Sequence, residues 1–351
     1  MEIAGRRIGP GEPAYIVAEL SANHGQQLDQ AIELIEAAAT AGADAVKLQT
    51  YTPDTITLDC DNPYFQIRSG TVWDGRTLRD LYAEAYTPWE WHEQLQREAH
   101  QRGLELFSSP FDDSAVDFLE RLDVPAYKIA SFELVDLGLI ARVAATGKPI
   151  IMSTGMATLP EIAEAVVSAR RAGATDLMLL KCTSAYPAPP EEANLRTMHN
   201  MAEIFGVPVG LSDHTLGIGV AVAAAALGAP LIEKHLTLSR GAPGPDSGFS
   251  LEPDELAEMV RQVHIAELAL GNVSYEPTER EMGSRMLRRS LFAVAHIRAG
   301  EKLTHENVRS IRPGHGLHTR HLREILGRRA TSEIARGTPL SWDLIAPNPP
   351  G

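Results

Sequence analysis

Short apolar segments alternate with longer amphipathic segments along residues 15–270. Most amphipathic segments end in a glycine, as at Gly42, and an apolar run follows within a few residues. Such segments predict helices closed by a left-handed glycine, and the apolar runs predict buried strands. The expected strands are residues 15–18, 45–48, 104–107, 126–129, 150–152, 177–180, 207–209 and 231–232, and the expected helices are residues 28–41, 88–102, 113–122, 137–145, 159–171, 191–204, 216–227 and 253–270.

Eight strands, each followed by a helix, predict an α/β fold built as a closed (β/α)8, or TIM, barrel. An open doubly wound sheet is the alternative, but no glycine-rich dinucleotide fingerprint follows the first strand. The connection from Thr50 to Thr87 is much longer than the others and carries six aromatic residues. Long loops are usually functional, so this one either covers the barrel mouth or packs its aromatic side chains against the outer helices.

The pattern changes after Gly271. Residues 276–284 are polar and predict a linker between a barrel of residues 1–275 and a second domain of residues 285–351. The second part carries short apolar runs and turns and no long amphipathic segment. We therefore expect a large catalytic domain followed by a small domain of short strands.

Composition limits the class of protein. Of the 351 residues, 44% are hydrophobic, as in a globular protein with a large core, and the net charge of −14 argues against nucleic-acid binding. The longest apolar stretch is too short for a membrane span, the N-terminus lacks a signal-peptide core, and two cysteines cannot build a disulfide framework. We expect a cytoplasmic protein with reduced thiols that binds neither nucleic acid nor membranes.

The charge is distributed unevenly along the chain. From Ser284 to Gly351, twelve Lys and Arg stand against five Asp and Glu, which gives +7, so the remaining residues carry −21. Parts of opposite charge can attract each other within one chain or between subunits. The alternative is that the basic part is only a solvated surface.

Two histidines follow the last two expected strands. His214 and His235 should lie at the carboxyl ends of neighbouring parallel strands. Such strands are about 4.8 Å apart, so both rings could bind one metal ion at the edge where α/β folds build their sites. A structural histidine at a strand end is the alternative. With two imidazoles and oxygen ligands such as Glu19 or Asp246, Mn²⁺ or Mg²⁺ is favoured over structural zinc.

Lysine and hydroxyl side chains occupy the other strand ends. Lys47 and Lys128 lie inside expected strands, where a lysine is costly unless it meets an anion or a carboxylate. Two lysines beside several hydroxyls suit a substrate with phosphate and carboxylate groups. The alternatives are a structural network with Glu19 and Glu133, or a lysine that forms a Schiff base, as in barrel aldolases.

The chain resembles the sialic acid synthase family, which condenses phosphoenolpyruvate with amino sugars. The matching segments are residues 18–24, 46–50, 127–131, 153–156, 210–215, 233–235 and 244–246. The C-terminal part resembles that family's antifreeze-like (SAF) domain, with residues 312–314 in its signature position. Residues 63–67 and 81–92 are most similar to the branch that makes pseudaminic acid, which implies a 2,4-diacetamido-2,4,6-trideoxyaltropyranose substrate. Synthases of legionaminic acid or N-acetylneuraminate, with the same chemistry on another sugar, are the alternatives.

The resemblance also implies roles for individual residues. The catalytic set would be Glu19, Lys47, Lys128 and Glu133. Phosphoenolpyruvate would be held by Lys47, Ser109, Lys128, Ser131, Ser153 and Ser184, the last of which is asparagine in a typical sialic acid synthase. The sugar, a diacetamido hexose, would contact Gln49, Phe111, Glu133, Tyr186 and Asp246. A divalent metal, Mn²⁺ with Mg²⁺ or Co²⁺ as alternatives, would bind His214 and His235.

The family further implies a domain-swapped homodimer. In it, the SAF domain of one subunit covers the barrel mouth of the other, and Arg312 reaches the sugar across that interface. The rival functions are a non-catalytic carbohydrate-binding protein and a Schiff-base aldolase of sugar acids. Turnover of phosphoenolpyruvate would exclude a non-catalytic binding protein. Borohydride trapping of Lys47 or Lys128 would support the aldolase.

Overall fold

Eight parallel strands form a closed barrel in the computed structural model, which describes residues 1–68 and 74–347. Each strand pairs with the next along the chain, and the last closes the barrel against the first. The strands are β3 (Tyr15–Glu19), β4 (Ala45–Thr50), β5 (Glu105–Pro110), β6 (Tyr127–Ile129), β7 (Ile150–Ser153), β8 (Leu177–Cys182), β9 (Val209–Asp213) and β10 (Leu231–His235). The predicted TIM barrel is confirmed.

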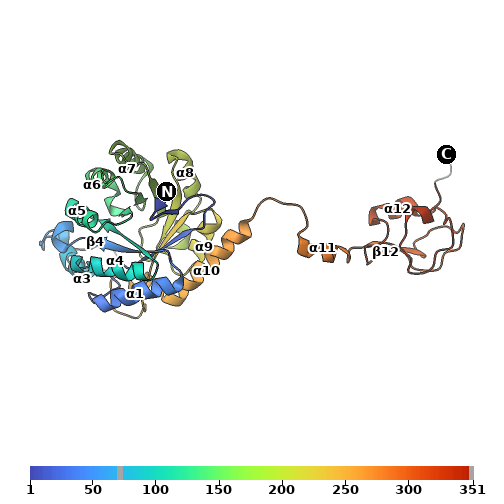
Figure 1. The fold of residues 1–351 in the computed structure, drawn as a ribbon, viewed down its shortest axis with the longest axis horizontal. Coiled ribbons are helices and arrows are strands. Elements are labelled where there is room, and N and C mark those ends of the chain that lie inside the picture. The colour runs from blue at the N-terminus through green and yellow to red at the C-terminus, as the bar shows by residue number, and fades with distance from the viewer. Residues whose placement is uncertain (69–73, 348–351) are drawn as a thin grey trace. The chain divides into compact units, whose positions relative to one another are not determined.

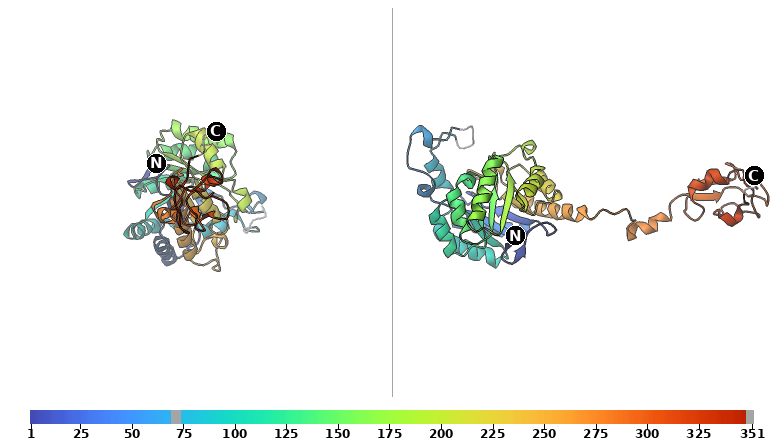
Figure 2. Two further views of the ribbon diagram at one scale, coloured as in Figure 1. Left: turned by 90° about the vertical axis from the view of Figure 1, so that its right-hand side faces the viewer. Right: turned by 90° about the horizontal axis from the view of Figure 1, so that it is seen from above.

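Helices follow the strands and surround the barrel (Figure 1, Figure 2). They are α1 (Leu28–Ala41), α4 (His92–Gln101), α5 (Asp113–Arg121), α6 (Leu137–Ala144), α7 (Leu159–Arg171), α8 (Thr197–Phe205), α9 (Gly219–Ala226) and α10 (Pro253–Leu270). Three begin later than the sequence predicted, namely α4, α8 and α9, and the 3₁₀ turn of residues 89–91 precedes α4. Before α8, η4 (Pro190–Glu192) is a separate 3₁₀ turn and Asn194 has a φ of 45°, and before α9, Gly217 has a φ of 71°.

The long connection after β4 is not a plain loop. It contains α2 (Pro53–Ile56), η1 (Pro63–Phe65) and α3 (Leu78–Ala85), and η2 (Trp89–Trp91) precedes α4. Its buried ring of Tyr51 packs edge-on against Tyr82 at 5.6 Å and against Phe111 at 5.0 Å. Tyr64 is exposed, and Trp73 lies outside the described residues. The described aromatic residues of this segment therefore do not pack together in one cluster.

Side chains alternate along each strand between two cores. One face packs against the helices, as Ile16, Ala18 and Ile232 do, whereas Tyr15, Val17 and Leu231 belong to a separate interior cluster. The short hairpin of β1 (Glu2–Ile3) and β2 (Arg6–Arg7) adds Ile3 and Ile8 to that interior cluster. Continuing the alternation toward the carboxyl ends brings charged residues to the interior, and these residues build the site.

The C-terminal part is a separate unit, because the chain divides into Met1–Gly271 and Asn272–Gly351. The second unit contains α11 (Glu279–Arg285), the antiparallel pair β11 (Ser290–Ala293) and β12 (Val308–Ile311), η6 (Thr319–His321), α12 (Leu322–Ile325) and η7 (Trp342–Leu344). Its own core includes Leu291, Ile297, Leu303 and Ile334. Among the described residues, no helix is both long and apolar enough to cross a membrane.

Candidate active site

Four buried charges lie inside the carboxyl mouth of the barrel. The Lys47 ammonium contacts the carboxylate of Glu19 and lies 3.6 Å from Glu233 Oε1, and Lys128 Nζ lies 3.4 Å from Glu233 Oε2. All four residues are at most 4% exposed. Glu233 thus bridges two lysines, and the two ammoniums are balanced by two carboxylates. The sequence analysis considered a network of the two lysines with Glu19 and Glu133. In the structure, the second carboxylate of these ion pairs is Glu233 and not Glu133.

Burial and mutual charge set the protonation of this group. Burial raises the pKa of Glu19 despite the neighbouring Lys47. Burial would lower the pKa of Lys47, but Glu19 and Glu233 raise it, so this lysine stays charged. Burial lowers the pKa of Lys128, whereas the two lysines hold the pKa of Glu233 down. Glu19 is therefore the carboxylate of this group that can most readily take up a proton.

Hydroxyl groups surround the backbone of Gly155, just after β7. The Gly155 N–H donates to Ser131 Oγ at 3.1 Å. A Cβ atom at Gly155 would lie 2.1 Å from Ser184 Oγ and 2.7 Å from Ser131 Oγ, so only glycine leaves this space to the hydroxyls. Ser153 is buried nearby on β7, with a hydroxyl that lacks a hydrogen-bond partner within the described part of the chain. Together they form a small cradle of hydroxyl groups around the Gly155 backbone.

The two histidines stand side by side, as their spacing predicts. Their ring centroids are 5.2 Å apart, and both side chains are buried. The Nδ1 atom of His214 lies 3.0 Å from the Thr183 carbonyl oxygen, so it carries the proton and leaves Nε2 as the free ligand atom. Burial, together with His214 and nearby lysines, lowers the pKa of His235 well below its usual range. His235 is therefore neutral, as a metal ligand must be.

The donor set fits a divalent metal ion. His235 Nδ1 is buried and lacks a hydrogen-bond partner among the residues that the structure describes. The rings of Tyr186, 4.4 Å from His214, and Phe249, 5.1 Å from His235, close off one side of the pair. Two imidazoles leave most coordination positions to substrate and water oxygens, which suits an open catalytic site rather than a closed structural one. No third His, Cys, Asp or Glu completes a metal cluster within residues 1–68 and 74–347.

A thiol lies next to the metal-binding pair. Cys182 Sγ is 3.8 Å from both His214 Nδ1 and Ser184 Oγ. Burial would raise the pKa of this thiol, but the contact with His214 and the charge of Lys128 help lower it to about 7. The same contact raises the pKa of His214, although burial alone would lower it. The sequence alone does not reveal this coupling, because Cys182 appears there as an isolated structural thiol.

The residues expected to hold a sugar form two groups. Gln49 Nε2 donates to Ser21 Oγ at 3.1 Å and to Glu19 Oε1 at 3.3 Å, and Ser21 Oγ donates to Asp246. Glu133 lies in η3 (Phe132–Val135), and burial raises its pKa to about 7. Its Oε2 atom is buried without a hydrogen-bond partner in the described ranges. Glu133 is thus a carboxyl group ready for a polar ligand.

The structure brings most of the expected residues together. Lys47 Nζ lies 3.4 Å from Ser109 Oγ, so the hydroxyl of Ser109 on β5 lies beside the four buried charges. Phe111 packs on Tyr51 just beyond the same strand. Arg312 is exposed in the second unit, and the position of that unit relative to the barrel is not defined. The sequence analysis assigned no site role to Glu233 or Ser212, whose side chains lie 3.2 Å apart inside the mouth.

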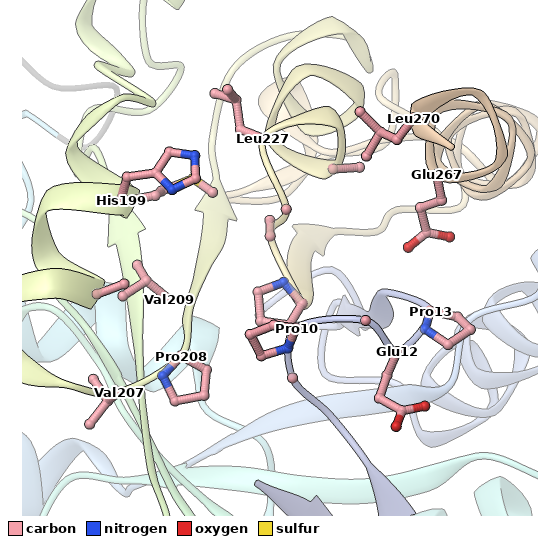
Figure 3. A pocket seen from close by; sticks show the side chains of 18 of the residues that line it. Pro10, Glu12, Pro13, His199, Val207, Pro208, Val209, Leu227, Glu267 and Leu270 are labelled. Carbon is pink, nitrogen blue, oxygen red and sulfur yellow. The ribbon is translucent and has the colours of Figure 1, made fainter. Parts of the chain in front are cut away.

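An apolar groove of about 1060 Å³ lies at the opposite end of the barrel. It is lined by residues that precede β9 and β10, such as Pro208 and Pro230, and by the segment around Pro10 (Figure 3). The histidines are at the carboxyl ends of those same strands. In TIM barrels the carboxyl ends carry the chemistry, so the groove is separate from the active site.

Comparison with known proteins identifies the family of the chain. Residues 34–275 match the NeuB family, and residues 288–346 match the SAF domain. A pseudaminic acid synthase of Helicobacter pylori is 46% identical over 95% of this chain and 98% of its own. An N,N'-diacetyllegionaminic acid synthase of Legionella pneumophila is 34% identical over 96% of each chain.

A solved structure gives the same result at the level of the fold. The sialic acid synthetase of Leptospira borgpetersenii, in complex with citrate, is 30% identical to this chain with a TM-score of 0.72. The match covers 81% of this chain and 94% of the synthetase. The barrel, the order of its strands and the matched ranges lead to one conclusion: this chain belongs to the NeuB family and carries a C-terminal SAF domain.

Proposed function

We propose that this protein is a pseudaminic acid synthase, which condenses phosphoenolpyruvate with 2,4-diacetamido-2,4,6-trideoxyaltropyranose and releases phosphate. The observation that carries the proposal is a pair of buried lysines and a group of hydroxyls beside two neighbouring histidines at one barrel mouth. The similarity to pseudaminic acid synthases over 95% of the chain supports this choice of sugar within the family.

The lysines and the hydroxyl cradle bind phosphoenolpyruvate. Lys47 and Lys128 supply charge, and Ser109, Ser131, Ser153 and Ser184 supply hydroxyl donors for the phosphate and carboxylate oxygens. An incoming anion competes with Glu19 and Glu233 for the two ammoniums. Because burial raises the pKa of Glu19, this carboxylate is suited to accept a proton later, when water attacks.

The reaction joins C3 of phosphoenolpyruvate to the aldehyde carbon of the open-chain sugar. The carbonyl oxygen of the sugar becomes a hydroxyl, a water oxygen adds to C2, and phosphate leaves with the bridging oxygen. Glu19 takes one proton from the attacking water and passes it to the new sugar hydroxyl, and the second water proton leaves with phosphate. Glu133 contacts the sugar and helps to open its ring. Holding both substrates in one pocket contributes roughly 7–11 kcal/mol.

A divalent metal held by His214 and His235, with Mn²⁺ favoured over Mg²⁺ or Co²⁺, would supply a Lewis acid for the sugar oxygen. The side chains of Gln49, Phe111, Tyr186 and Asp246 would then orient the sugar beside it. The fit of the donor set is the support for this role, since His235 is neutral and has an unpartnered ring nitrogen among the described residues.

Phosphate release identifies the substrate. The purified protein is assayed with phosphoenolpyruvate and, in separate reactions, the altro sugar, the diacetamido precursor of legionaminic acid and N-acetylmannosamine. We expect the highest kcat/KM with the altro sugar, and faster turnover of another acceptor would assign the protein to that branch. With ¹⁸O in the bridging position, the label should leave in phosphate, and label retained in the sugar acid would contradict C–O cleavage.

A Schiff-base aldolase is the second candidate function, and Lys128 is the residue that keeps it open. Burial lowers the pKa of this lysine below its ordinary value, whereas Glu19 and Glu233 raise the pKa of Lys47 although burial alone would lower it. Borohydride reduction with substrate should leave both lysines unmodified if the condensation proceeds as proposed. Mass shifts on Lys128 would instead support the aldolase.

We further propose that the protein works as a domain-swapped homodimer in which Arg312 completes the partner's sugar site. The basic C-terminal part and acidic remainder of the chain support such an assembly. Arg312→Ala and His235→Ala subunits should each be inactive, and mixing them should restore one working site per heterodimer. A mixture that stays inactive after verified subunit exchange would contradict the swap.

A further inference from the structure

A buried ion pair lies directly behind the two histidines. Lys234 Nζ donates to Asp213 Oδ2 at 2.6 Å, and the two side chains are 1% and 2% exposed. Lys234 precedes His235 on β10, and Asp213 precedes His214 at the end of β9. In the barrel register, Lys234 is paired with Asp213, so this is the last pair between the two strands before the histidines.

The contacts of Lys234 enclose the backbone around His214. The same ammonium donates to the carbonyl oxygen of Thr215 at 2.5 Å. Asp213 Oδ1 in turn accepts the backbone N–H of Thr215 at 2.9 Å. Both chain neighbours of His214 are therefore held by one side chain, and that side chain is adjacent in sequence to the other histidine.

Alternation along the strands places this pair on the opposite face from the site. Ser212 and Glu233 meet inside the mouth, and His214 and His235 meet there as well, with the ion pair between these two levels on the other face. Asp213 and Lys234 therefore do not touch either substrate. They can act on the site only through the backbone that carries the histidines.

We propose that Asp213 and Lys234 are positioning residues that set the separation and orientation of His214 and His235 for metal binding. The ion pair, together with its two contacts to Thr215, locks the register of β9 against β10 and the course of the turn after β9. Without it, the His214 backbone loses its fixed attachment to the strand of His235. Residues outside the ligand set whose contacts orient the ligands typically contribute 10- to 100-fold to metal affinity.

The test measures Mn²⁺ binding by electron paramagnetic resonance titration of the purified full-length protein. Because the inference rests on the proposed metal site, wild-type protein and His235→Ala are titrated first. If wild type binds no Mn²⁺, the metal proposal fails. If wild type binds Mn²⁺ and His235→Ala does not, the metal site is established and the Asp213–Lys234 pair can be examined separately.

The informative variant is Asp213→Asn/Lys234→Met, which removes both charges and leaves no unpaired buried ion. We expect its Mn²⁺ affinity to fall at least tenfold, with an altered spectrum of bound Co²⁺, while its circular dichroism stays that of a folded barrel. Asp213→Asn alone keeps the contact of Lys234 with the Thr215 carbonyl oxygen and should lose less affinity, although it leaves that ammonium without its carboxylate. Leu34→Ala, on the buried face of α1, is the control for lost stability alone and should bind Mn²⁺ as wild type does.

Two results would overturn the inference. One is a folded double variant with wild-type Mn²⁺ affinity and an unchanged Co²⁺ spectrum, which would make the pair a stabilising contact only. The other is equal loss of affinity in Leu34→Ala, which would attribute the effect to general loosening of the barrel. If neither Asp213→Asn/Lys234→Met nor Asp213→Asn folds, the ion pair acts on folding, and its assignment as a positioning element is withdrawn.

Discussion

Replacing Gly155 with alanine should damage phosphoenolpyruvate binding and leave the barrel intact. The added methyl group would lie 2.1 Å from Ser184 Oγ and 2.7 Å from Ser131 Oγ, far inside contact distance. Both hydroxyls end short side chains, so they can turn away at a cost of about 0.5–1.5 kcal/mol. The hydroxyls would then point away from the anion they are proposed to bind.

The loss can be estimated from the hydrogen bonds involved. A hydrogen bond to a charged group contributes about 1.5–3 kcal/mol. Since 1.36 kcal/mol corresponds to a factor of ten, losing one such bond should raise the KM for phosphoenolpyruvate about 10- to 150-fold. The KM for the sugar should change less, and any change should come through Tyr186, which is assigned to the sugar and hydrogen-bonds to Ser184.

Steady-state phosphate release with each substrate varied in turn measures this effect. Gly219→Ala is the matched control, because a Cβ there has nothing within 4 Å. We expect Gly219→Ala to behave as wild type, with Gly155→Ala losing phosphoenolpyruvate affinity and keeping its thermal midpoint within a few degrees. An unchanged KM for phosphoenolpyruvate in Gly155→Ala would refute the assignment of the cradle.

Three further changes test other parts of the site. Glu233→Gln removes a carboxylate shared by two buried lysines and should lower the unfolding free energy in urea by about 3–5 kcal/mol; a loss under about 1 kcal/mol would contradict the bridging role. Burial raises the pKa of Glu133 from 4.5 to about 7, so folding takes up a proton between these values. The unfolding free energy should therefore fall as pH rises from 4.5 to 7, and Glu133→Gln should lack that slope. His235→Ala should abolish activity at any Mn²⁺ concentration. Full activity of the wild-type protein in metal-free buffer would exclude a role for the metal in the reaction.

The barrel could be predicted because its strands are short apolar runs and glycines end many of its helices. The errors arose where local backbone geometry decides the boundary. Helix α8 begins at Thr197 because a 3₁₀ turn and the positive φ of Asn194 intervene, and neither follows from apolar spacing. The segment after Thr50 has no clear period, yet its chain folds into short helices whose ends are fixed by capping side chains such as Thr52 and Thr77.

The site was predictable where a polar residue interrupts or ends an apolar run, and it was not where the role of a residue depends on partners far away in sequence. The histidines and both lysines interrupt apolar runs visibly. Glu233 was missed as a site residue because its function depends on lysines from β4 and β6, far away in sequence. A period of two counted back from His235 could have placed Glu233 inside the barrel and Lys234 outside it. The contact of Cys182 with His214 was missed for the same reason, because it joins the ends of neighbouring strands β8 and β9 and its two residues are 32 positions apart in sequence.

Anomalous diffraction from crystals soaked with Mn²⁺ and phosphoenolpyruvate tests the central claim most directly. We predict one manganese peak between the imidazoles of His214 and His235, with the phosphate of phosphoenolpyruvate against Lys47, Lys128 and the hydroxyls around Gly155. Manganese bound elsewhere, or phosphoenolpyruvate bound away from those lysines, would contradict the account.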